Sequence, residues 1–207
     1  MVSRPARRQN KANNKASNNQ GAVRIIAGLF KGKKLPVMDL NGLRPTTDRV
    51  KETLFNWLMF DVAGSQVLDC FAGSGSLAFE ALSRGAISAN MLEQSASAAK
   101  QLQQNLASLK LPAEVNSEII TTDSLNYLAK PANKQFDLIF IDPPFRQNLV
   151  EPCCQLLAQN GWLQTDALIY IEHEKELTSL DLPNTWQLLK SQSAGQSSYH
   201  LYQHQLD

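Results

Sequence analysis

The order of short apolar runs and amphipathic segments after residue 65 restricts the possible fold more than any other feature of the chain. Apolar runs too short for helices predict strands over residues 66–70, 88–92, 115–121, 136–141 and 167–171. Amphipathic segments between them predict helices over residues 76–84, 96–108 and 148–158, with a short helix after residue 123. Strands that alternate with helices predict an α/β fold, in which helices cover both faces of a doubly wound, mostly parallel sheet.

Two pairs of shorter strands flank this alternating region. Both pairs predict antiparallel hairpins, one over residues 23–27 and 33–37 and the other over residues 186–190 and 199–204. The second hairpin would extend the parallel sheet at one edge. After the first hairpin, the apolar spacing predicts a helix over residues 48–60, which Thr46 or Thr47 can cap.

Composition changes sharply at the N-terminal end. Residues 1–20 are polar and basic, and we expect them to be disordered. Residues 1–45 hold ten Lys and Arg but one acid, Asp39, and carry +9 in a chain whose net charge is +1. A basic end on an acidic body predicts a polyanionic partner. We divide the chain into a basic tail (1–20), a basic hairpin with its helix (21–60) and a main domain (61–207).

Cysteine spacing and hydropathy exclude several classes of protein. Cys153 and Cys154 are adjacent and Cys70 stands alone, which suits neither a metal site nor a disulfide framework. No apolar run approaches the roughly 20 residues of a membrane span, and the N-terminus lacks the apolar segment of a secretory signal. We therefore expect a cytoplasmic protein with buried thiols, no metal and no membrane association.

The turn Asp142-Pro143-Pro144-Phe145 directly follows a predicted buried strand. Each proline fixes its own φ at about −65° and lacks an amide donor, so the turn is stiff and extended. A carboxylate, carbonyl oxygens and an aromatic ring are thereby held close together. Asp142 and a proline carbonyl can accept hydrogen bonds from an amino group, while Phe145 stacks on the ring that carries it.

A glycine-rich turn follows the first strand of the main domain. Gly73-x-Gly75-x-x-Ala78 allows a ligand to approach the backbone at a helix N-terminus, and Glu93 follows where a ribose-binding acid is expected. This pattern does not distinguish NAD from S-adenosylmethionine. The candidate cofactor-binding residues are Asp69, Phe71, Ala72, Gly73, Ser74, Gly75, Glu93, Asp123 and Ser124.

Acids at the ends of the strands favour S-adenosylmethionine. Asp69 suits the ammonium of a methionine moiety and would repel a pyrophosphate, and Asp123 can accept a hydrogen bond from an adenine amino group. Asp142 ends the fourth strand, which is a neighbour of the first strand in a doubly wound sheet, at the point where ligands bind. The strand-end acids and the glycines therefore predict one site.

These motifs resemble those of class I S-adenosylmethionine-dependent methyltransferases, and Asp-Pro-Pro-Phe resembles the subset that methylates exocyclic amino groups. The closer resemblance is to bacterial 16S ribosomal RNA guanine-N2 methyltransferases of the RsmD type. It rests on residues 24–28, 43–58 and 68–75 and extends from about residue 23 to the C-terminus. The block Arg44-Pro45-Thr46-Thr47-Asp48-Arg49 is its most specific part, because general methyltransferases lack it. Phe145 replaces the Tyr of the wider motif, but stacking needs only the ring.

The resemblance implies a Rossmann-like, seven-stranded methyltransferase sheet with an added N-terminal β-hairpin. It implies S-adenosylmethionine as the cofactor and a guanine of 16S rRNA as the substrate, within an assembling 30S particle. We expect a monomer whose catalytic turn is Asp142 to Phe145. The candidate RNA contacts are Arg24, Lys31, Lys33, Lys34, Arg44, Thr46 and Arg49.

Three other functions fit parts of the pattern. Adenine-N6 and glutamine methyltransferases use related Pro-Pro-aromatic turns, but the Arg-Pro-Thr-Thr block argues against them. A nicotinamide oxidoreductase is disfavoured by Asp69, and no hydride-handling site is evident. A catalytically silent RNA-binding assembly factor would not need the intact turn at Asp142.

Overall fold

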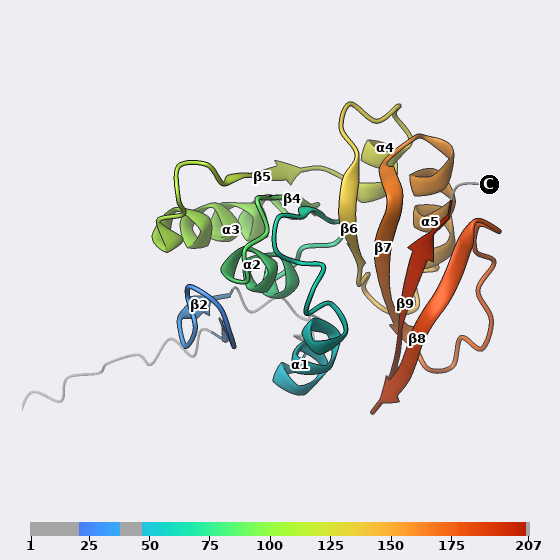
Figure 1. Ribbon diagram of the computed structural model, residues 1–207, viewed down its shortest axis with the longest axis horizontal. Coiled ribbons are helices and arrows are strands. Elements are labelled where there is room, and N and C mark those ends of the chain that lie inside the picture. Colours follow the sequence, from blue (N-terminus) through green and yellow to red (C-terminus); the bar gives the residue numbers. More distant parts are fainter. Residues whose placement is uncertain (1–20, 38–46, 206–207) are drawn as a thin grey trace, which may run out of the picture.

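The structure is a computed structural model that describes residues 21–37 and 47–205, so the expectation for residues 1–20 lies outside the described residues. Five parallel strands form the centre of the main sheet: β3 (Gln66–Asp69), β4 (Ser88–Glu93), β5 (Asn116–Thr121), β6 (Phe136–Ile141) and β7 (Leu163–Glu174). The antiparallel strands β8 (Trp186–Ala194) and β9 (Ser197–His204) complete it. The order of the seven strands is β5-β4-β3-β6-β7-β9-β8 (Figure 1), which confirms the predicted sheet and its C-terminal hairpin.

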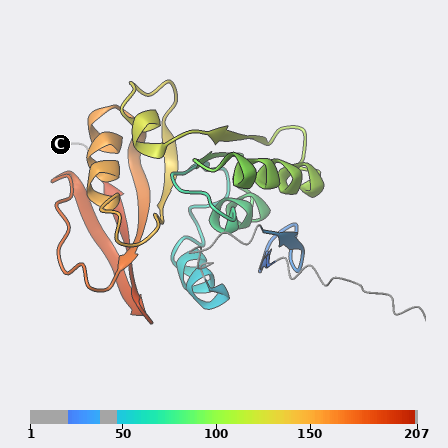
Figure 2. The ribbon, with the colours of Figure 1, turned by 180° about the vertical axis from the view of Figure 1, so that it is seen from behind.

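Helices cover both faces of this sheet (Figure 2). They are α1 (Asp48–Trp57), α2 (Ser76–Ser83), α3 (Ala96–Leu109), α4 (Ser124–Leu128) and α5 (Val150–Gln159). The two faces have separate apolar clusters, the first with residues of α1, α2 and α3 and the second with residues of α4 and α5. Neighbouring residues of β3 point to opposite faces, since Val67 belongs to the first cluster and Leu68 to the second.

The N-terminal hairpin lies against the first of these clusters. Its strands β1 (Ala22–Arg24) and β2 (Lys34–Pro36) are antiparallel and shorter than the sequence predicts. Val23 and Leu35 point inward and are buried together with Leu54 of α1. The hairpin and α1 therefore share a core with the main sheet. Thr47 caps α1, as predicted, because its hydroxyl accepts a hydrogen bond from the Val50 amide at 3.4 Å.

Several element boundaries differ from those predicted, and strand β8 in particular extends to Ala194 rather than ending at residue 190. Helix α1 ends at Trp57 rather than at residue 60, and Phe60 is exposed. Strand β7 is longer than the predicted 167–171 at both ends. At its C-terminal end, the polar residues Glu172 and His173 interrupt the apolar pattern but still pair with β9. The longer strand places Glu172 at the same edge of the sheet as the ends of β3 and β6.

The described residues contain no helix that is both long enough and apolar enough to span a membrane. Within the same residues, no group of three or more His, Cys, Asp and Glu side chains is arranged to hold a metal ion.

Candidate active site

A cavity of about 1140 Å³ opens at the carboxyl ends of the central parallel strands. Strands β3 and β6 are direct neighbours, with Asp69 opposite Phe140 in their register. The glycine-rich turn after β3 and the proline turn after β6 therefore line the same cavity, although they lie far apart in the sequence. The candidate residues that line it are Asp69, Phe71, Ala72, Gly73, Ser74, Glu93, Asp123, Ser124, Asp142, Pro143, Pro144 and Phe145.

Gly75 makes the glycine-rich turn possible. It precedes α2 with a φ of 73°, and a Cβ atom at this position would lie 2.3 Å from the ring of Phe79. Glu93 holds the same turn from β4. Its Oε2 accepts a hydrogen bond from the Gly73 amide at 2.9 Å, and its Oε1 accepts one from the Ser95 amide at 2.7 Å. Gly75 is not itself a lining residue, but it allows the turn that Glu93 then holds in the wall of the cavity.

Asp69 is the most deeply buried acid of the cavity, with 2% of its surface exposed. Burial raises the pKa of Asp69 to about 7, with a further contribution from the charge of Glu93, against the backbone amides of Phe71 and Ala78. None of the ion pairs among the described residues includes Asp69, Glu93 or Asp123. A cationic ligand would therefore compensate a charge that these residues leave uncompensated.

Asp123 and Ser124 have roles in the fold as well as places in the cavity. Oδ1 of Asp123 caps α4 by accepting a hydrogen bond from the Asn126 amide at 2.8 Å. The buried hydroxyl of Ser124 donates to the carbonyl of Cys70, directly after Asp69. Ser124 thus joins the start of α4 to the end of β3.

The proline turn presents a partly buried carboxylate and ring to the cavity. Asp142 and Phe145 are half-buried, Pro143 is buried and Pro144 is exposed. The end of the turn is fixed to β7, because the Arg146 amide donates a hydrogen bond to Oε1 of Glu174 at 3.1 Å.

The cavity has further lining residues that the sequence analysis did not identify. Glu172 comes from β7, and Gln196 and Ser197 come from the turn between β8 and β9. Thr47 and Val50 line it from the start of α1. The sequence did hold a signal for Glu172, because it follows the apolar run that ends at Ile171, just as Asp69 and Asp142 follow theirs.

Some of the candidate RNA contacts already have partners within the protein, and others are exposed to solvent. Arg24 forms an ion pair with Asp48 at 2.7 Å, and Lys33 donates a hydrogen bond to the carbonyl of Ser108 on α3. Exposed positions are held by Lys31, Lys34 and Arg49. Arg44 and Thr46 lie outside the described residues.

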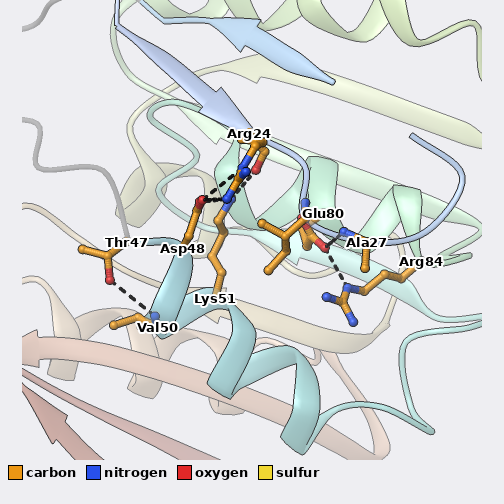
Figure 3. A network of polar contacts seen from close by, with 9 residues as sticks. Arg24, Ala27, Thr47, Asp48, Val50, Lys51, Glu80 and Arg84 are labelled. Carbon is orange, nitrogen blue, oxygen red and sulfur yellow. Dashed lines mark hydrogen bonds and ion pairs between the residues drawn. The ribbon is translucent and has the colours of Figure 1, made fainter. Parts of the chain in front are cut away.

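A buried acid on α2 fastens the N-terminal hairpin to the main domain (Figure 3). The carboxylate of Glu80, 0% exposed, accepts hydrogen bonds from the Ile26 amide at 2.8 Å and the Ala27 amide at 3.0 Å. It also pairs with Arg84 at 2.8 Å. The Glu80 carboxylate of α2 therefore holds the chain that follows β1, and α2 itself begins at the cavity.

A buried cation on α1 completes this network (Figure 3). Lys51 is 1% exposed, and its ammonium donates a hydrogen bond to the Arg24 carbonyl at 2.6 Å and lies 3.6 Å from Asp48. Burial lowers the pKa of Lys51, against the opposing charges of Glu80 and Asp48. Asp48 and Lys51 belong to the segment that carried the specific resemblance, so part of that segment connects α1 to the hairpin.

Comparison with known proteins identifies the family. The family model described as "Conserved hypothetical protein 95" matches residues 23–203. Ribosomal RNA small subunit methyltransferase D of Haemophilus influenzae is 53% identical over 90% of this chain and 96% of its own length. The protein of the same name from Escherichia coli is 47% identical over 88% of this chain and 90% of its own length.

A solved structure extends the similarity to the fold. The Escherichia coli protein yhhF has a TM-score of 0.82 and 44% sequence identity, over 89% of this chain and 99% of its own. The range matched by the family model, residues 23–203, includes the hairpin except Ala22, the sheet except His204, and every cavity residue named above. By these matches the chain belongs to the Conserved hypothetical protein 95 family, together with the small subunit methyltransferases D.

Proposed function

We propose that this protein transfers a methyl group from S-adenosylmethionine to the exocyclic N2 of one guanine in the 16S ribosomal RNA of the small subunit. The observation that carries the proposal is the shared cavity of Asp69, the glycine-rich turn and the turn from Asp142 to Phe145. The relatives named small subunit methyltransferase D, at 53% and 47% identity, support ribosomal RNA as the substrate.

The carboxylates of the cavity fit S-adenosylmethionine, which supplies an electrophilic methyl group on a sulfonium when it is bound. Asp69 would hold the methionine ammonium, which returns its raised pKa toward the ordinary range. Glu93 would accept hydrogen bonds from the ribose hydroxyls while it keeps the Gly73 amide in place. Asp123 would accept a hydrogen bond from the adenine amino group. The Ser124 hydroxyl, which donates to the Cys70 carbonyl, fixes the loop that carries Asp123.

Alignment is the main catalytic task, because the guanine amino lone pair is delocalised into its ring. Asp142 and the Pro143 carbonyl would accept the two N2 hydrogens and turn the nitrogen lone pair toward the methyl group, at about 3 Å. They would also stabilise the positive charge that develops on the nitrogen. Asp142 or water then takes the proton. Phe145 would stack on the flipped guanine, a contact of roughly 1–3 kcal/mol.

The RNA would approach across the hairpin and α1, which border the cavity through Pro36, Val37 and Thr47. The exposed cations Lys31 and Lys34 would contact phosphates, so each one removed lowers the salt dependence of binding by about one unit of slope. Arg24, Lys33, Arg44, Thr46 and Arg49 belong to the same proposed surface. We propose further that a cytoplasmic monomer acts on an assembling 30S particle.

The substitution Asp142→Ala tests this proposal. Turnover should fall by roughly 10²–10³-fold, because an acceptor aimed at the developing charge is lost. The affinity for S-adenosylmethionine, measured by calorimetry, should stay within about threefold. Mass spectrometry of ribosomal RNA from a deletion strain should show one missing N2-methylguanine. Near-normal turnover of the variant would remove Asp142 from the mechanism, and an unchanged RNA would reject the substrate.

A further inference from the structure

Glu172 is a second carboxylate beside the catalytic turn, and the function proposed above gives it no task. Ile141 of β6 pairs with Ile171 of β7, so the residues that follow them, Asp142 just after β6 and Glu172 within β7, lie side by side. Both residues line the cavity. Glu172 is only 6% exposed, so a base that enters the cavity would meet it with little competing water.

A buried tyrosine holds this carboxylate in place. The Tyr170 hydroxyl donates a hydrogen bond to Oε2 of Glu172 at 2.8 Å. Burial raises the pKa of Tyr170 well above its usual range, with added effects of Glu172 and Asp142, so the phenol keeps its proton and remains a donor. Among the described residues, no other side chain or amide donates to Glu172, which leaves Oε1 available to a ligand. The ring of Tyr170 is fixed by Phe140 and Tyr199, with ring centroids 6.3 Å and 6.4 Å away.

The group next to the reactive amine differs between the bases. In guanine, N2 is adjacent to N1, which carries a hydrogen and is a donor. In adenine, N6 is adjacent to N1, and in cytosine N4 is adjacent to N3, and both of these ring nitrogens are acceptors. With the amine at Asp142, an acceptor on the neighbouring strand would be satisfied by guanine alone. The other two bases would place a lone pair against a carboxylate.

We propose that Glu172 accepts the N1 hydrogen of the flipped guanine and thereby selects guanine over adenine and cytosine. This inference rests on the proposed function, because it assumes that the amine to be methylated is bound at Asp142. Tyr170 is a positioning residue that orients Glu172. Adenine-N6 methyltransferases use a related proline turn, so the turn alone does not select the base. Under this proposal the selectivity for guanine comes from Glu172 of β7.

The test uses 2-aminopurine, which keeps the amino group but has an acceptor at N1. The methylated guanine is first mapped with wild-type protein, and 16S RNA is then prepared with guanine or 2-aminopurine at that position, alone or reconstituted with small-subunit proteins. Methyl transfer to both is measured for the wild type, for Glu172→Gln and for the control Glu118→Gln. Glu118 lies on the edge strand β5, is exposed and is not among the residues that line the cavity.

The wild type should prefer guanine over 2-aminopurine by roughly 10²-fold or more in kcat/KM, as sites that read a hydrogen-bond donor do. Glu172→Gln should lose at least about tenfold on guanine but not on 2-aminopurine, because a glutamine amide can donate to the N1 acceptor. Glu118→Gln should match the wild type. Binding of S-adenosylmethionine and thermal unfolding show whether each variant is folded.

Three results would contradict parts of this account, and they can be told apart. A wild-type preference below about tenfold would show that N1 is not read, even if Glu172→Gln fails to fold. A folded Glu172→Gln variant that keeps the wild-type preference for guanine over 2-aminopurine would show that Glu172 does not recognise N1. A wild type that methylates no guanine would reject the proposed function itself.

Discussion

The protein buries acidic charge in two places that differ in how the charge is compensated. Glu80 is bound by two backbone amides and by Arg84, and the charge of Lys51 also interacts with it. Asp69 is almost equally buried but takes part in none of the ion pairs among the described residues. The first arrangement fastens a hairpin, whereas the second leaves a charge for a ligand to neutralise.

The difference separates structural from functional buried charge. A buried charge that has internal partners destabilises the protein when a partner is removed. A buried acid without such a partner has a raised pKa, as Asp69 does at about 7. Its charged form destabilises the ligand-free protein but can bind a cationic ligand. Substitutions at the two sites should therefore change stability in opposite directions.

The largest effect is expected for Glu80→Ala. The substitution leaves the Ile26 and Ala27 amides and the Lys51 ammonium without the carboxylate, and the free energy of unfolding should fall by about 3–5 kcal/mol. Denaturant unfolding at pH 7 measures this loss. The control Glu118→Ala, on an exposed edge strand, should change the free energy by less than about 0.5 kcal/mol. A loss below about 1 kcal/mol at Glu80 would mean that the hairpin is held by its apolar contacts alone.

Asp69→Asn should have the opposite effect on the protein without ligand. An uncharged amide removes the cost of a buried carboxylate, so the free energy of unfolding at pH 8 should rise by roughly 2–4 kcal/mol, given a pKa of about 7. Binding of S-adenosylmethionine, measured by calorimetry, should be lost. A variant that is destabilised at pH 8 and still binds the cofactor would place Asp69 with the structural charges.

The dependence of stability on pH follows from the same group. The folded-state pKa of Asp69 lies above its ordinary value of 3.8, so its contribution to stability is fully present below pH 3.8 and is lost as the pH rises through about 7. The free energy of unfolding of the ligand-free protein should therefore decrease between about pH 4 and 7, by up to about 1.4 kcal/mol per pH unit more than in Asp69→Asn. Saturating S-adenosylmethionine should remove this difference. Parallel curves for the two proteins would show that Asp69 does not titrate in this range.

The sequence predicted the strand-end site better than the hairpin attachment, for a physical reason. Asp69, Glu93, Asp123 and Asp142 each follow an apolar strand, and the parallel topology then brings them to one edge of the sheet. Lys51 lies in an amphipathic helix, where nothing in the local pattern distinguishes a buried ammonium from an exposed one. Its place in the core depends on the Arg24 carbonyl and on the charge of Glu80, both distant in the sequence, which no periodicity encodes.

Glu172 lies between these two cases. Its position after an apolar run was visible, but the polar pair of Glu172 and His173 made the strand look shorter than it is. Glu172 nevertheless stays in the strand, because it pairs with Tyr199 of β9, while the Tyr170 hydroxyl holds its carboxylate. A strand predicted from apolar residues alone therefore ends too early where its last residues face a polar site.

The smallest effect should come from the exposed ion pair at the edge of the network. The side chains of Arg24 and Asp48 are 55% and 42% exposed, so a double-mutant cycle of Arg24→Ala and Asp48→Ala should give a coupling free energy of about 0.2–1 kcal/mol. Arg24 can then exchange Asp48 for an RNA phosphate at little cost. Arg24→Ala should lower the salt dependence of RNA binding by about one unit of slope, whereas Asp48→Ala should leave it unchanged or raise it. A coupling free energy above about 2 kcal/mol would instead place this pair with Glu80, among the charges that fasten the hairpin.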